Sequence, residues 1–444
     1  MEQRHNMDML RGPLAGKLLR FTLPIVLSSM LQQLFNAADT AVVGRFGDAG
    51  ALAAVGANTE IVALIVTFSS GLSVGANVLL ANRIGRRETG GLPDIVRTAV
   101  VFAALCGVLG MLAGQRAAGP LLRLTGTPEL IRSSAEQYLR IYLLGYPFLL
   151  LYDFGAAALR ARGESRYPFL ALLASGILNV LLNLLFVTAF RLGVAGVALA
   201  TALSTALSAA MVLLRLKKDA MLRLALRRPL LQEAYLVQIL QTGVPSTLQG
   251  AVFCFANIFV QTAVNGFGPT VIAGSTIAMN FEYFAYYAIT AFGQTATTFI
   301  SQNHAAGQYG RCRKILLLCL GFALLSSFVM IVPVICLRTR FCGFFSPESA
   351  VIGSACVRLL CILLFEPACC LYEIPAGAIR GAGHAVLPSV SAMVGTCAFR
   401  IVWICTLFRA QPSLPLLYRA FPLSWLATII LTALSFLIAR PFRK

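Results

Sequence analysis

Acidic residues interrupt several long apolar stretches of this sequence. Asp39, Glu282, Glu366 and Glu373 all stand among aliphatic and aromatic neighbours. An ionisable side chain inside a membrane is energetically expensive, and it usually serves a function. A buried carboxylate can bind a proton or a sodium ion in one conformation and release it in another. These positions are therefore the first candidates for a binding or coupling site.

Glu282 stands in an aromatic run that continues with Tyr283. An acid among aromatic rings suits a lipophilic cation, through charge pairing and through the attraction of a cation to the ring faces. An aromatic run on a helix is also typical of a packed core or of lipid contact. We interpret Glu282 and Tyr283 as substrate or coupling candidates.

Further charged and polar residues lie within or beside the long apolar stretches. Glu366 and Arg400 are expected on neighbouring transmembrane segments, and since two buried charges are held most cheaply as a pair, we interpret them as a structural ion pair. Asp153 and Glu373 each precede an arginine-containing turn, so they either bind protons or substrate or neutralise those arginines. Four amide side chains are candidates for hydrogen bonds to a ligand or between helices: Gln33, Asn36, Asn257 and Gln261.

The composition decides which elements position these side chains. Of 444 residues, 58% are hydrophobic and 12% are charged, whereas soluble domains carry roughly 25% charge. Apolar runs such as 141–159 and 170–190 reach the ~20 residues that a helix needs to cross a bilayer. Only helices satisfy their backbone groups over such runs, and no alternating pattern indicates a barrel. We predict an all-α integral membrane fold of twelve transmembrane helices.

The net charge of +19 reflects topology rather than a nucleic-acid partner. Lysines and arginines concentrate at both termini and in alternate connecting segments, as the positive-inside rule expects of cytoplasmic segments. We predict a multi-pass membrane protein with both termini cytoplasmic and its basic segments against anionic lipids. The 12 cysteines lack a Cys-x-x-Cys pair and are interpreted as small buried hydrophobes. With three histidines, no metal site is expected.

The sequence repeats itself at a displacement of 220 to 221 positions. Pro24 aligns with Pro245, and Arg160 aligns with Arg380. Further aligned pairs are Asn36 with Asn257, Val43 with Val264, Asn82 with Asn303, and Gly163 with Gly383. Each half holds an even number of spans, so both halves enter the membrane in the same direction, as in transporters built from parallel repeats. We predict two pseudo-symmetric six-helix bundles at 1–214 and 234–444, a basic cytoplasmic linker at 215–233, and a substrate pathway between the bundles.

Four stretches in order resemble the multidrug and toxic compound extrusion (MATE) family over essentially the whole chain. They are 36–56, 71–85, 159–163 with its partner 379–383, and 178–201. The resemblance implies a secondary active antiporter of the bacterial plasma membrane that exports amphipathic or cationic organic compounds by alternating access. It implies H⁺ or Na⁺ as the coupling ion and no other cofactor. We expect a monomer whose partners are its small-molecule substrates and membrane lipids.

The resemblance also implies a cation site in the amino-terminal half. Matching members use the acid at the position of Asp39 for coupling, together with the positions of Asn179, Asn183 and Thr201. Amide and hydroxyl oxygens are suitable ligands for a hard cation beside one carboxylate. The sequence departs from the pattern at Asn183, where many members have Asp. This bundle therefore keeps its oxygen ligands but loses one negative charge, and both H⁺ and Na⁺ remain open.

Two other classes of function compete with drug export. A lipid-linked oligosaccharide flippase of the same superfamily would have a strongly basic cavity for a diphosphate, whereas acids outnumber Arg400 within the expected spans. A membrane-embedded transferase or hydrolase would need clustered His, paired Asp or a Cys/His nucleophile, and none of these stands out in the sequence. We therefore expect a transporter and not an enzyme.

Overall fold

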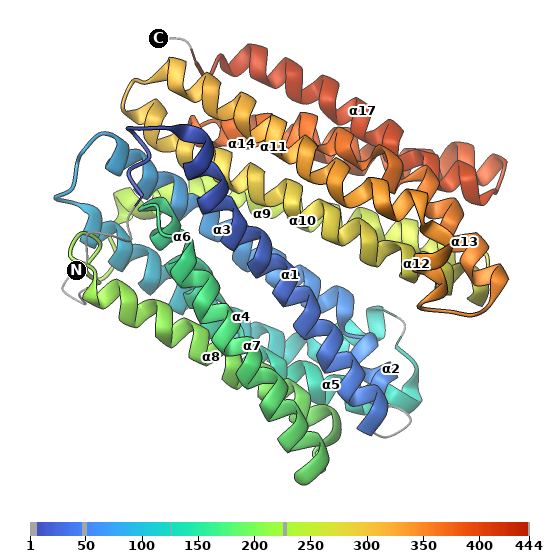
Figure 1. The fold of residues 1–444 in the computed structure, drawn as a ribbon. Coiled ribbons are helices and arrows are strands. Elements are labelled where there is room, and N and C mark those ends of the chain that lie inside the picture. The colour runs from blue at the N-terminus through green and yellow to red at the C-terminus, as the bar shows by residue number, and fades with distance from the viewer. Residues whose placement is uncertain (1–6, 47–50, 126, 225–228, 443–444) are drawn as a thin grey trace. The chain divides into compact units, whose positions relative to one another are not determined.

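The computed structural model describes residues 7–46, 51–125, 127–224 and 229–442, apart from the side chains of 36–38, 40, 41, 43–46 and 52. All regular secondary structure in these ranges is helical. The first half contains α1 (Leu14–Phe46), α2 (Ala51–Gly56), α3 (Thr59–Gly85), α4 (Leu92–Leu124), α5 (Glu129–Leu144), α6 (Tyr146–Ala161), α7 (Arg166–Leu184), the π-helical η2 (Leu185–Ala189) and α8 (Gly193–Lys218) (Figure 1).

The second half follows the same plan with more irregular turns. It contains α9 (Glu233–Asn265), α10 (Pro269–Ala305), α11 (Tyr309–Cys336), α12 (Arg338–Gly343), α13 (Ser349–Cys361), η3 (Leu363–Cys369), α14 (Cys370–Gly381), α15 (Val386–Ala392), η4 (Met393–Ala398), α16 (Phe399–Trp403), η5 (Ile404–Phe408) and α17 (Leu414–Ala439). The turn η3 is a 3₁₀-helix, while η4 and η5 are π-helical.

Ten helical segments of the described chain are long and apolar enough to cross a membrane. The pair α5 and α6 forms an eleventh span that is bent by 43°. The 37-residue α10 is also longer than a bilayer requires, and it carries Glu282 among polar and aromatic neighbours. Together these elements make twelve transmembrane helices, which confirms the predicted all-α membrane fold.

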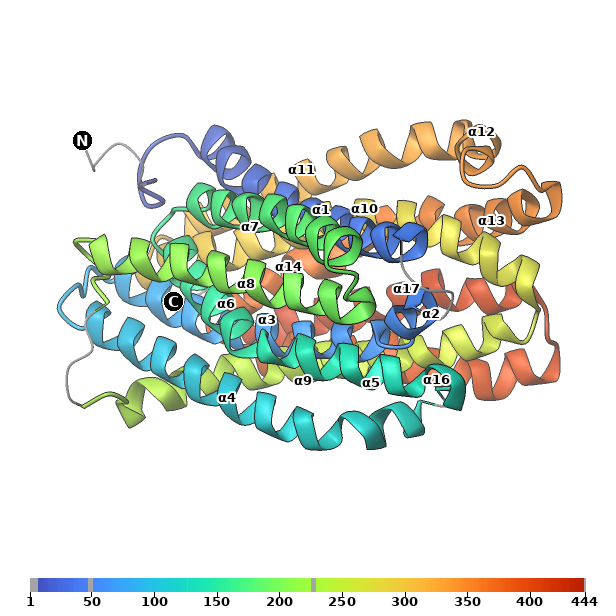
Figure 2. The same cartoon turned by 90° about the horizontal axis from the view of Figure 1, so that it is seen from below.

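The chain divides into two compact units. The first contains 1–8 and 23–247, and the second contains 9–22 and 248–444. Within the first unit, α6 lies against α3, α4 and α8 (Figure 2). Within the second, α10 lies beside α11 and α14 (Figure 1). The predicted bundle boundaries at 214 and 234 stay a prediction. The start of α1 belongs to the second unit, and the start of α9 belongs to the first.

Close backbone packing explains why the start of α9 belongs to the first unit. Gly71 and Gly75 stand one turn apart on α3, a spacing that lets two membrane helices approach closely. A Cβ atom at Gly75 would lie 2.0 Å from the Ile239 carbonyl oxygen, and one at Gly243 would lie 2.8 Å from the Leu72 carbonyl oxygen. Only glycine fits at this crossing of α3 and α9.

The start of α1 is held in the second unit by side-chain contacts with α10. The hydroxyls of Thr22 and Thr295 are hydrogen-bonded at 2.8 Å. One turn away, the rings of Phe21 and Phe299 meet edge to face, with centroids 5.3 Å apart. Both phenylalanines are fully buried, so this contact removes a large apolar area from the surroundings.

Candidate functional site

The helix α7 presents two asparagines toward α1 and α8. Asn179 and Asn183 are four residues apart, so they lie on one face of the helix, and both are buried. One turn before Asn179, a Cβ atom at Gly176 would lie 1.7 Å from the ring of Phe35 on α1. The glycine therefore allows α1 to pass close to α7. Asp39 follows Phe35 by one turn of α1, which brings its carboxylate to the asparagines.

Four polar side chains form a closed ring of hydrogen bonds in the first unit. Asn183 Nδ2 donates to Asp39 Oδ1 at 2.5 Å and to Asn179 Oδ1 at 3.1 Å. Thr201 Oγ1, on α8, donates to Asp39 Oδ2 at 3.3 Å, and Asn179 Nδ2 donates to Thr201 Oγ1 at the same distance. The structure thus brings together the four residues that the family resemblance named. We call Asp39, Asn179, Asn183 and Thr201 the Asp39 ring.

The Asp39 ring holds one formal charge in buried surroundings. Asp39 is 8% exposed, and no described lysine or arginine lies within salt-bridge distance of it. The Oδ1 atom of Asn183 is buried and accepts no hydrogen bond from the side chains and backbone that the structure describes. Carboxylate, amide and hydroxyl oxygens are the ligands that hard cations prefer. The ring can therefore hold a proton on the carboxylate or a small cation among its oxygens.

Two features allow the hydrogen bonds of the Asp39 ring to rearrange. The π-helical η2 begins two residues after Asn183, and π-helical turns are frequent at functional sites. The Thr201 hydroxyl also lies 3.0 Å from the Val197 carbonyl oxygen. Because this hydroxyl has one hydrogen, it donates either to Asp39 or to Val197.

The acid Asp153 has a separate partner in the first unit. Ser69 Oγ, on α3, donates to Asp153 Oδ2 at 2.5 Å. The guanidinium of Arg160 donates from Nε to the Ala156 carbonyl at 3.2 Å, within its own helix. Asp153 is thus bound to α3 by a hydroxyl, and it does not belong to the Asp39 ring.

In the second unit, Glu282 forms a buried ion pair with Arg358. The guanidinium donates from Nε to Glu282 Oε1 at 2.8 Å and from Nη2 to Oε2 at 2.7 Å. Its Nη1 donates to Ser275 Oγ at 2.7 Å. The rings of Tyr418 and Phe421 lie 5.3 and 5.7 Å from the guanidinium carbon. Such a bidentate pair is the strongest arrangement of these two groups.

Arg358 was not among the site residues predicted from the sequence, where Glu282 had no proposed cationic partner. Arg358 is only 4% exposed and lies in the last turn of α13. The apolar residues on both sides of Arg358, from Val351 to Leu364, were the signal that could have placed it inside the membrane.

The predicted ion pair between Glu366 and Arg400 is wrong. Arg400 donates to Ser424 Oγ at 3.1 Å and to Asn257 Oδ1 at 3.4 Å, and its guanidinium carbon lies 4.1 Å from the centre of the Phe421 ring. Glu366 lies in the 3₁₀ turn η3, and among the described residues its buried Oε2 has no hydrogen-bond donor. Arg400 thus faces α9 and α17 and is held by neutral dipoles and an aromatic ring.

The remaining candidates are dispersed. Asn257 meets Arg400, Gln261 donates to Asn265 Oδ1 at 2.8 Å, and Tyr283 stacks on Tyr287 with ring centroids 6.1 Å apart. Glu373 packs on α10, since a Cβ atom at Gly293 would lie 3.2 Å from its Cγ. Gln33 is half-buried on α1, and the side chain of Asn36 lies outside the described residues.

The repeat seen in the sequence has a counterpart among known families. The sequence profile of the MatE family matches residues 24–185 and, a second time, residues 245–405. The chain belongs to the MatE family. The two matched segments start at the prolines that the repeat pairs, Pro24 and Pro245, and each covers most of one half. The predicted family membership is therefore confirmed.

Individual relatives of this MatE chain are transporters by name. The probable multidrug resistance protein YoeA of Bacillus subtilis is 27% identical over 383 residues, which cover 83% of this chain and 82% of YoeA. The multidrug export protein MepA of Staphylococcus saprophyticus is 21% identical, over 77% of this chain and 76% of MepA. A MOP superfamily transporter from Pyrococcus furiosus has the same fold, with a TM-score of 0.89 at 20% identity over 97% of this chain and 96% of its own. The MatE chain is thus a membrane transporter and not an enzyme, as expected.

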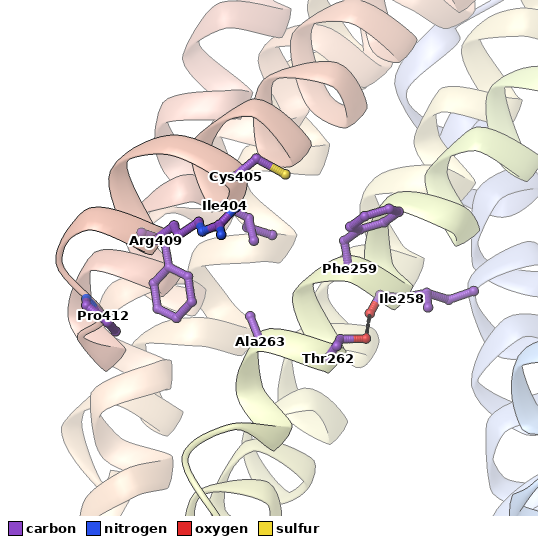
Figure 3. A pocket seen from close by; sticks show the side chains of 9 residues that line it. Ile258, Phe259, Thr262, Ala263, Ile404, Cys405, Arg409 and Pro412 are labelled. Atoms are coloured by element: carbon purple, nitrogen blue, oxygen red, sulfur yellow. Dashed lines mark hydrogen bonds between the residues drawn. The ribbon is translucent and has the colours of Figure 1, made fainter. Parts of the chain in front are cut away.

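A pocket of the MatE chain's second unit is lined by described residues of which none was predicted as a site residue. Its volume is about 530 Å³, and Figure 3 shows the end of α9 on one side and η5 with the following turn on the other. Its lining is mostly apolar: Ile258, Phe259, Thr262, Ala263, Ile404, Cys405, Phe408, Arg409 and Pro412. The Thr262 hydroxyl is already used, since it donates to the Ile258 carbonyl at 2.9 Å. We assign this pocket no part in coupling.

Proposed function

We propose that this MatE chain exports amphipathic, cationic organic compounds across the bacterial plasma membrane in exchange for H⁺ or Na⁺. The observation that carries the proposal is the Asp39 ring, a single buried carboxylate surrounded by neutral hydrogen-bonding side chains. The names of YoeA and MepA, which refer to multidrug resistance and export, support the choice of substrate class. Both termini lie in the cytoplasm in this proposal, as the charge bias indicates.

The Asp39 ring suggests how cation binding changes local structure. An ionised Asp39 accepts hydrogen bonds from Asn183 and Thr201. A protonated Asp39 gains a donor and accepts more weakly, so the Thr201 hydroxyl turns to the Val197 carbonyl. Because these residues lie on α1, α7 and α8, uptake of a cation changes the contacts among three helices. Alternating access then uses the difference in stability between the two arrangements.

Transport under separate gradients tests the proposal. Purified protein in liposomes that contain ethidium should export the dye when an inward H⁺ or Na⁺ gradient is imposed. Protein-free liposomes under the same gradients serve as the control. If neither ethidium nor any other cation tested moved in response to an H⁺ or Na⁺ gradient, drug export would be contradicted. A flippase would instead move a lipid-linked oligosaccharide in the same liposomes and leave ethidium in place.

Replacing Asn183 by Asp should lower the Na⁺ concentration that export requires. The substitution puts a second carboxylate into the Asp39 ring at the position where Nδ2 lies 2.5 Å from Asp39 Oδ1. A second negative charge attracts a sodium ion more strongly, by on the order of 1–2 kcal/mol at partly screened distances. We expect the Na⁺ concentration for half-maximal export to fall by about tenfold.

The control for this variant is Asn183→Ala, which removes the same amide without adding a charge. Titration of initial export rates with Na⁺ at constant pH measures both variants. An unchanged Na⁺ dependence in Asn183→Asp, with export still active, would show that Na⁺ does not bind in the Asp39 ring.

A further inference from the structure

Two cysteines of the second unit lie next to each other at the junction of α12 and α13. Cys342 is fully buried and belongs to an apolar cluster with Ala355 and Leu359 of α13. Cys356 directly follows Ala355 and is partly exposed. The Cys356 thiol lies close enough to Cys342 to affect its ionisation. Both are free thiols in this structure.

The backbone at this junction supports the contact between the two thiols. The helices α12 and α13 pack against each other. A Cβ atom at Gly343, the residue after Cys342, would lie 4.0 Å from Ile352 Cδ1. Ile352 precedes Cys356 by one turn of α13, so both side chains lie on the face of α13 that meets α12.

We propose that Cys342 and Cys356 form a disulfide that ties α12 to α13 in the mature protein. The inference rests on the topology in the proposed function, in which cytoplasmic termini place the connection between α11 and α13 outside the cytoplasm. Disulfides form and persist in that environment. The pair thus departs from the sequence-based interpretation of all cysteines as inert hydrophobes.

The chemistry is a thiol–disulfide exchange with an extracytoplasmic oxidoreductase. The partly exposed Cys356 thiolate attacks the disulfide of that protein, forms a mixed disulfide and releases one oxidoreductase thiolate. The Cys342 thiolate then attacks Cys356 Sγ and displaces the second oxidoreductase thiolate. The two cysteines lose two protons and two electrons, and the oxidoreductase leaves as a dithiol.

Burial of Cys342 controls the rate of the second step. Burial raises the pKa of this thiol to about 11, and α12 lies outside the candidate membrane spans. Because only the thiolate attacks, its fraction rises about tenfold per pH unit below that pKa. Closure of the pair should therefore accelerate as the pH rises.

The disulfide would brace the surroundings of the Glu282–Arg358 pair. Phe281, the neighbour of Glu282, meets Phe341 and Phe345 on either side of Cys342, with ring centroids 6.0 and 5.9 Å apart. Cys356 precedes Arg358 by two residues. A bond between the cysteines thus fixes the segment that covers Phe281 to the helix that carries Arg358.

Mass spectrometry of the full-length protein tests the inference. Cells are treated with N-ethylmaleimide at harvest, and the purified chain is digested with trypsin. Cleavage after Arg340 and Arg358 leaves both cysteines in one peptide, 341–358, and cleavage after Glu348 then separates them. We expect this peptide to carry no maleimide, and its two parts to stay joined until a reductant is added. Maleimide on both Cys342 and Cys356 would overturn the inference.

Variants keep the test specific. Cys356→Ser should make Cys342 available to maleimide under denaturing conditions, whereas Cys336→Ser and Cys405→Ser, at exposed cysteines, should leave the joined peptide unchanged. A joined peptide in Cys356→Ser would contradict the pairing. The measurement reports thiol state alone, so it is independent of ethidium export. A negative result for the joined peptide therefore counts against the disulfide alone, and a negative result for ethidium export counts against the proposed function alone.

Discussion

Replacing Asp39 by Asn is expected to reduce gradient-driven export to the level of protein-free liposomes while the protein stays folded. The amide has nearly the same volume as the carboxylate. Its oxygen can still accept from Asn183, and its NH2 group can donate to the Thr201 hydroxyl, which then donates to the Val197 carbonyl. The amide cannot take up or release a proton, and it brings no negative charge to a sodium ion. The Asp39 ring therefore keeps its packing and loses its response to cations.

Export of ethidium from proteoliposomes measures this effect, with elution on size exclusion to verify folding. The matched control is Glu129→Gln, because Glu129 is an exposed acid that pairs with the partly exposed Arg132 at 3.4 Å outside the Asp39 ring. We expect the control to export at the wild-type rate. Wild-type coupled export in Asp39→Asn would remove Asp39 from the mechanism.

Removal of the Arg358 guanidinium should destabilise the protein more than other single substitutions. Arg358→Met leaves Glu282 buried without its cation, and breaking a buried pair in this way costs about 3–5 kcal/mol. It also removes the hydrogen bond to Ser275 and the contacts with the rings of Tyr418 and Phe421. We expect a large fall in the thermal unfolding midpoint and in the yield of folded protein.

The double variant Glu282→Met with Arg358→Met separates stability from transport. Replacement of both partners by apolar side chains is often close to neutral for stability, so most of the lost thermal stability should return. If Glu282 also serves substrate or coupling, the stable double variant will not export ethidium. Arg340→Met, at an exposed arginine of α12, is the control for loss of an arginine. A double variant as unstable as Arg358→Met would argue against the ion pair as the cause.

The sequence was sufficient for the fold because membrane helices and repeats leave local signals. Apolar runs of span length and the alignment of Pro24 with Pro245 are readable without any contact. The Asp39 ring is different. The four-residue spacing of Asn179 and Asn183 puts them on one face, but their meeting with Asp39 depends on the close approach of Gly176 to Phe35. No pattern within either helix reports that approach, and only the family resemblance named the four residues.

The buried charges of the second unit could not be paired from depth along the sequence. The position of a residue along a span predicts how deep it lies in the membrane. Whether two charges pair also depends on the direction in which each side chain points. The π-helical η4 ends two residues before Arg400, and the 3₁₀ turn η3 contains Glu366. Each has a different number of residues per turn from an α-helix, so it rotates the side chains that follow. The partner of Glu282, Arg358, lies on the regular helix α13, but its spacing in the sequence gives no sign that its side chain points to α10.

The helices α1 and α9 each belong partly to one unit and partly to the other, which affects how the units can move. Besides the connection after Asp8, the chain passes between the units inside α1, after Thr22, and inside α9, after Thr247. Each of these two crossings within a helix lies within two residues of a proline, Pro24 in α1 and Pro245 in α9. Proline removes one backbone hydrogen bond and weakens the helix there against bending. In the proposed alternating access, a rocking of the units would therefore flex both helices at equivalent positions of the repeat.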